Sequence, residues 1–192
     1  MSGARLRGGV LRGVFRLATG RADGMAAFGD TRAAFLGSLA PLVVVPVLAE
    51  TLLALGGAAE EGPAPLDLLA TLCALLAPPV VSHWFAVRWG REAWWLRFAT
   101  AFNWCQWAVP AAACLLLLLA SGLIASGVSS EIAGRAWIFA LAAYGIWLHW
   151  FIARHGLLLS RMRAAVLVAG VNAITVACVV GPVLIARLLA GT

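Results

Sequence analysis

Two histidines in a repeated phrase are the residues of this chain best suited to ligand chemistry. HWFAVRWG begins at His83 and HWFIARHG begins at His149, and the copies share His, Trp, Phe, Arg and Gly at matching positions. Two imidazoles placed alike on two helices could hold a haem or a metal ion. A repeated signal for the edge of a membrane would produce the same phrase without any ligand.

The composition places the elements that hold these histidines in a membrane. Of the 192 residues, 63% are hydrophobic and 11% are charged, and the mean hydropathy is +0.96. An ordinary soluble domain is about half apolar and about a quarter charged. Five apolar stretches reach the roughly 20 residues that a transmembrane helix needs; they cover residues 33–55, 65–87, 101–126, 133–153 and 164–187.

The sequence therefore predicts an all-α, polytopic membrane protein with a bundle of five transmembrane helices over 33–187. A basic N-terminal segment, 1–32, precedes the bundle, and a short C-terminus, 188–192, follows it. The N-terminal segment mixes arginines with apolar residues at helical spacing, which favours a partly amphipathic helix at an anionic membrane surface. Its glycines favour a partly frayed segment instead.

The arginines predict the orientation of the bundle. Six precede the first span, three follow the second and three follow the fourth, whereas the opposite side holds only Arg135 and Arg187. The positive-inside rule then places the N-terminus in the cytoplasm and the C-terminus in the periplasm. Heavy use of Arg, Ala, Leu and Gly without any lysine suggests a bacterial source, and hence the inner membrane. The same distribution explains the net charge of +6 without a nucleic-acid partner.

This topology puts both copies of the phrase at the cytoplasmic edge. Trp84 and Trp150 would anchor at the headgroups, and Arg88 and Arg154 would meet lipid phosphates. The Trp and Phe after each histidine leave little room for a macrocycle. The anchor interpretation is therefore preferred to a haem held by His83 and His149, and neither a cofactor nor a metal ion is expected.

A few other polar or kinking residues lie within the apolar stretches. Asn103 and Gln106 share one face of the third span, where amides usually bond a neighbouring helix but can also recognise a substrate. Pro78 and Pro79 indicate a kink, or a discontinuous helix at a transport site. Glu50 is a functional candidate because it is an intramembrane carboxylate, although it lies near enough to the outer end of its span to reach the headgroups.

The stretch REAWWLRFATAFNW, residues 91–104, resembles the entry to the third span in small bacterial proteins of the Yip-domain family. The matching residues are Arg97, Phe98, Asn103 and Trp104. RADGMAAFGDTRAAF, residues 21–35, resembles the lead-in to that family's first span. The resemblance implies a five-helix membrane domain without enzymatic chemistry. The family's eukaryotic members are tied to vesicle trafficking through Rab partners, a role that does not transfer to a bacterial chain.

The predicted function is that of a non-enzymatic accessory, scaffold or assembly subunit docked on a larger bacterial membrane complex. No catalytic motif is present, and the short loops leave no soluble domain. The expected partners are membrane lipids and a membrane protein. A small-molecule or lipid transporter is the first alternative, and a b-type haem protein is the second. The candidate partner-interface, lipid-interface or helix-packing residues are Trp84, Arg88, Arg97, Asn103, Trp104, Gln106, Trp150, Arg154 and Glu50.

Overall fold

Every regular element of the computed structural model is a helix within the residues it describes, which are 2–55 and 65–190, with side chains for 9–44 and 72–182. The elements in chain order are α1 (Ser2–Ala18), the 3-10 helix η1 (Ala22–Ala27), α2 (Arg32–Leu55), α3 (Pro65–Arg88), α4 (Glu92–Cys105), α5 (Ala108–Ala125), α6 (Ser130–Gly156) and α7 (Arg161–Ala190). The all-α prediction is confirmed.

Three stretches are long and apolar enough to cross a membrane: Glu92–Ala125, which comprises α4 and α5, Ser130–Gly156 and Arg161–Pro182. The parts of α2 and α3 with described side chains form shorter apolar helices, Arg32–Val44 and Leu72–Arg88. These helices are consistent with a membrane protein. Five complete spans stay a prediction.

Residues 101–126, predicted as one span, lie in α4 and α5, which meet at Gln106 and Trp107. Pro110 explains the break, because proline has no N–H and its ring clashes with the carbonyl four residues earlier, here that of Gln106. Tighter i→i+3 bonds form around the break: Gln106 N to Asn103 O at 3.3 Å, Trp107 N to Trp104 O at 3.3 Å and Val109 N to Gln106 O at 3.2 Å. By contrast, α3 continues through Pro78 and Pro79, so the discontinuous-helix alternative is wrong.

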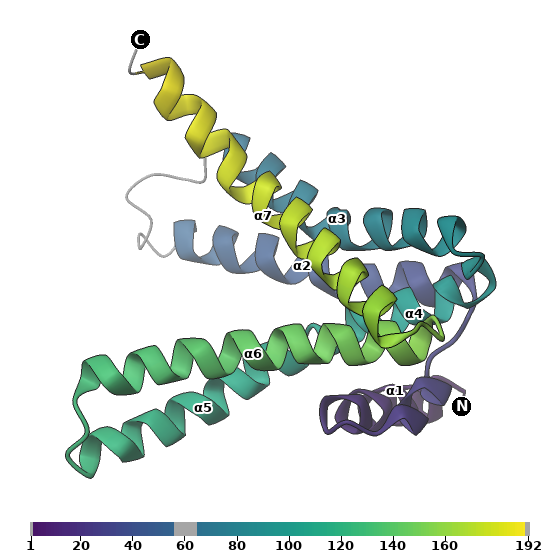
Figure 1. Cartoon of the computed structure of the whole chain (residues 1–192), viewed down its shortest axis with the longest axis horizontal. Helices are drawn as coiled ribbons and strands as arrows, with labels where there is room; N and C mark the ends of the chain where they lie inside the picture. Colours follow the sequence, from purple (N-terminus) through teal and green to yellow (C-terminus); the bar gives the residue numbers. More distant parts are fainter. Residues whose placement is uncertain (1, 56–64, 191–192) are drawn as a thin grey trace.

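Figure 1 shows α1 and the α3–α4 and α6–α7 turns at one end of the bundle, with the α5–α6 turn at the other. We call the first the arginine-rich end, because five arginines border its two turns: Arg88, Arg91, Arg154, Arg161 and Arg163. At the other end, Arg135 donates to Glu131 at 2.6 Å in an exposed ion pair within α6. The helices thus run alternately between the arginine-rich end and the end that holds the α5–α6 turn.

The hydrophobic core lies toward the arginine-rich end. Its largest fully buried apolar side chains are Leu17, Phe98, Leu148, Ile152, Leu157 and Leu167, from α1, α4, α6, the α6–α7 turn and α7. Toward the opposite end, α5 packs against α6 and leaves Leu115 and Leu118 exposed by 61% and 73%. Such apolar faces suit contact with hydrocarbon and not with water.

The N-terminal segment forms the helix α1 followed by η1, and its frayed alternative stays a prediction. A Cβ added at Gly13 would lie 2.6 Å from the Cβ of Ala27, and one added at Gly24 would lie 2.7 Å from the Gly13 carbonyl oxygen. The glycine at position 13 therefore permits close approach of α1 and η1. The Tyr144 hydroxyl also donates to the Ala18 carbonyl at 3.2 Å, which fastens the end of α1 to α6.

Candidate functional site

A cavity of about 380 Å³, called the chamber below, lies among α2, α3, α4, α6 and α7. This volume falls within the range of about 300–1,000 Å³ that small-molecule sites occupy. The polar residues that line it are Asn103, Gln106, His149, Asn172 and Thr175. Its other lining residues are apolar, and none of the described lining residues is charged. The chamber thus offers hydrogen bonds without a fixed charge.

Asn103 joins two walls of the chamber. Its side chain is 2% exposed, and its Nδ2 donates to the Ser38 Oγ at 2.9 Å. The Ser38 hydroxyl in turn donates to the Phe35 carbonyl at 2.6 Å. This chain of hydrogen bonds fixes the amide nitrogen between α4 and α2. Asn103 therefore both packs two helices together and borders the chamber.

His149 brings a buried nitrogen to the chamber. Its Nε2 is enclosed and has no hydrogen-bond partner among the described residues, and its ring lies 4.7 Å from that of Phe102. An adjoining cavity of about 10 Å³, also bordered by Ser82 and Asn172, has room for about one water molecule. An unpaired buried polar atom lowers stability by about 1–3 kcal/mol. We therefore expect a water molecule or a ligand to form a hydrogen bond with the His149 Nε2.

Asn172 and Thr175 add two polar groups from α7, one turn apart on the helix. The Asn172 Nδ2 donates to the Val168 carbonyl within its own helix at 2.8 Å, which leaves the Oδ1 to accept. Thr175 was not identified from the sequence as a candidate site residue. Its spacing from Asn172 could have indicated it, because residues three apart share a helix face. Ser38 was missed as well, since a lone serine in an apolar run gives little sign of its partner.

His83 lies in different surroundings from His149. Its ring packs edge-on against Trp95 at 4.6 Å, and it does not line the chamber. The contacts that the two histidines make on α4, Trp95 and Phe102, are seven residues apart, or about 10 Å along a helix axis. The structure therefore does not bring His83 and His149 to one cavity. The haem hypothesis gains no support from it and stays a prediction.

The Trp and Arg residues of the repeated phrase lie at the arginine-rich end but differ in their contacts. Trp84 is 62% exposed, and Arg88 is exposed as well. In the second copy, the Trp150 Nε1 donates to the Arg161 carbonyl at 3.1 Å, and the Arg154 guanidinium lies 5.4 Å from the Trp150 ring centre. The second copy thus fastens the α6–α7 turn, whereas the first presents its tryptophan outward.

The two glycines of the phrase also differ. Gly90 takes a positive φ of 65° just after α3, as expected for a residue that ends a helix. At Gly156, the last residue of α6, close packing and not a positive φ requires glycine. A Cβ there would lie 3.0 Å from both Met25 and Phe98, and the positive φ of that turn, 51°, belongs to Leu158. Gly156 is thus a packing residue.

The remaining candidates lie around the chamber or apart from it. Gln106 lines the chamber at the break between α4 and α5. Arg97 donates to Asp30 at 2.7 Å, and Trp104 lines a separate groove beside α1. The side chain of Glu50 lies outside the described residues.

No protein-family model matches the chain, and no curated protein or solved structure matches it either. The resemblance of residues 21–35 and 91–104 to Yip-domain proteins therefore stays a prediction. The geometry of the chamber is the basis on which a function is proposed.

Proposed function

We propose that this chain is a non-enzymatic, five-span protein of the bacterial inner membrane that binds a small uncharged molecule in the chamber and transports it. The supporting observation is the convergence of two asparagines, a glutamine, a threonine and a histidine on one cavity. The proposal favours the transport alternative over the accessory-subunit prediction, because a subunit that only docks has no need of a polar cavity among its own helices.

The ligand class follows from the chemistry of the lining. Amides and hydroxyls both donate and accept hydrogen bonds, and the described lining offers no charge to pair with an ion. An uncharged molecule with several polar groups, such as a polyol or an amide, suits this lining. In this proposal α2 and α3 complete the five spans, and the arginine-rich end faces the cytoplasm.

Transport predicts that the chamber opens to water on both sides of the membrane. Thr175→Cys is expected to react with a charged, membrane-impermeant thiosulfonate in both right-side-out and inside-out vesicles. Val176→Cys is the matched control, because the neighbouring Val176 on the same helix is 57% exposed and does not line the chamber. Thiols react as thiolates, which form in water, so the reaction at position 175 should be about tenfold faster or more.

Both variants are made in a protein in which Cys73, Cys114 and Cys178 are replaced by alanine. The reaction of that protein, which retains the buried Cys105, is subtracted as the background rate. Equal reaction at positions 175 and 176, or none at 175 from either side, would contradict the proposal. Reaction from one side only would indicate a binding pocket without transport.

The accessory-subunit function remains a second candidate, favoured by the surface of α5. This helix packs chiefly against α6, and Leu117, Leu118 and Leu119 are each more than half exposed. A partner helix could cover this face within the membrane. Purification in mild detergent should then recover a stoichiometric membrane partner, and Leu118→Arg should release it. A homogeneous preparation of the chain alone would argue against this function.

A further inference from the structure

A second cavity, called the inner groove below, lies between α1, the start of α2 and α4, away from the chamber. Its volume is about 650 Å³. The lining residues are Val10, Leu11, Ala27, Gly29, Thr31, Ala34, Gly37, Thr100 and Trp104. Most of them are small or apolar, and the two threonine hydroxyls are engaged locally: Thr100 donates to the Leu96 carbonyl, and Thr31 accepts from the Ala34 N–H.

Part of the inner groove is empty because Gly37, which lines it, has no side chain. A Cβ added at Gly37 would meet nothing within 4 Å, although Gly37 lies in the first part of α2. Leu11, on the opposite wall, is 68% exposed. The result is an apolar slot beside α1. Figure 1 shows α1 at the arginine-rich end.

Three arginines lie close in sequence to residues that line this slot. Arg12 follows Leu11, Arg32 follows Thr31, and Arg97 lies one turn before Thr100. Arg97 is neutralised by Asp30 at 2.7 Å, whereas Arg12 and Arg32 are exposed and form no ion pair with another described residue.

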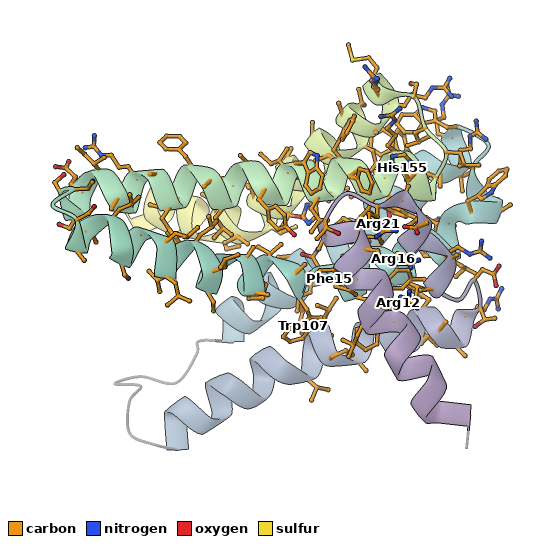
Figure 2. The ribbon with its side chains drawn as sticks, turned by 90° about the horizontal axis from the view of Figure 1, so that it is seen from below. Arg12, Phe15, Arg16, Arg21, Trp107 and His155 are labelled. Atoms are coloured by element: carbon orange, nitrogen blue, oxygen red, sulfur yellow. The ribbon has the colours of Figure 1, made fainter. Side chains whose placement is uncertain are left out.

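Figure 2 shows Arg12, Phe15 and Arg16 along α1, with Trp107 near Phe15 in that view. Phe15 is 69% exposed. Exposed aromatic and cationic side chains along one helix are typical of a helix that lies in the membrane interface. The inner groove would then open at the depth where acyl chains meet phosphates.

We propose that the inner groove binds an anionic phospholipid, with one acyl chain between α1 and α2 and its phosphate near Arg12 and Arg32. The apolar lining matches the acyl chain, and the two unpaired arginines match the phosphate. This site is independent of the chamber and of the transport proposal, because the two cavities share no lining residue.

Native mass spectrometry of the delipidated full-length protein in detergent tests this proposal, with phosphatidylglycerol and phosphatidylcholine as probes. Each arginine near an anionic lipid contributes about 1 kcal/mol, or roughly a fivefold preference. Phosphatidylglycerol should therefore be retained preferentially. Arg12→Gln and Arg32→Gln should each reduce that preference by about fivefold.

Gly37→Leu tests the acyl-chain half of the proposal, because its side chain would enter the open slot without a backbone clash. It should abolish retention of the lipid. Gly134→Leu is the matched control, because Gly134 is a helical glycine in α6 that also has nothing within 4 Å of an added Cβ; it should bind as the wild type does. Thermal unfolding of both variants confirms that they are folded.

Three results would overturn the proposal. Equal retention of the two lipids would remove the role of the arginines. Loss of retention in the Arg→Gln variants with full retention in Gly37→Leu would place the lipid on the surface outside the groove. A dimer that disappears in Gly37→Leu would show that a second copy of the chain occupies the groove.

Discussion

Phe98→Ala is expected to lower the free energy of unfolding by about 3–5 kcal/mol, the usual cost of truncating a buried phenylalanine. Phe98 is 1% exposed and lies where α4 meets α6 and η1. Its ring centre lies 5.7 Å from that of Phe102, and Gly156 has no Cβ to displace it. Truncation would leave a void that the surrounding helices can close only in part.

The matched control is Phe139→Ala, because Phe139 on α6 is 74% exposed. Its ring lies on the outside of the bundle, so its truncation should lower the free energy of unfolding far less. Unfolding of both variants in mixed micelles, followed by tryptophan fluorescence, measures the difference. Similar costs at the two positions would show that the stabilising core does not lie at the arginine-rich end.

Gly13→Val is expected to detach α1 from η1. The added Cβ would lie 2.6 Å from the Cβ of Ala27, 3.0 Å from the Phe28 ring and 3.1 Å from the Gly24 carbonyl oxygen. Two of these neighbours are a methyl group on the backbone and the backbone itself, so neither can swing aside. Overpacking of this kind costs about 1–3 kcal/mol. Because α1 is a single helix at the edge of the fold, we expect it to move away from η1.

Limited trypsin digestion of vesicles that expose the N-terminal segment measures this detachment. Cleavage after Arg16 and Arg21 should accelerate by about tenfold, because each 1.4 kcal/mol of local opening changes an equilibrium by that factor. Gly9→Val is the control in the same helix, since a Cβ at Gly9 meets nothing within 4 Å. If both variants were cleaved at the same rate, the effect would come from valine's helix propensity and not from the close crossing.

Part of the chamber could be predicted from the sequence. Asn103 and Gln106 were singled out as one face of the third span, and both line the chamber. Pro78, which together with Pro79 indicated a kink, lines it as well. They are recognisable because a polar or helix-bending residue stands out in an apolar run. Thr175 and Ser38 were not singled out, since nothing in their own segments shows which helix each will face.

The repeated phrase separates what the sequence by itself determined from what only the tertiary structure decided. Apolar runs must pair their backbone groups within helices in a membrane, so composition alone determined the all-α class. The arginine spacing likewise predicted that both copies of the phrase lie at one end, where the turns after Arg88 and Arg154 are found (Figure 1).

Only the packing of α4 against α3 and α6 decided that His149 borders the chamber whereas His83 lies on Trp95. Two similar stretches acquire different neighbours because the helix between them differs along its length. The close approach at Gly13 is tertiary in the same sense. It depends on which surfaces meet, and a sequence pattern indicates the face of a helix but not the helix that packs against it.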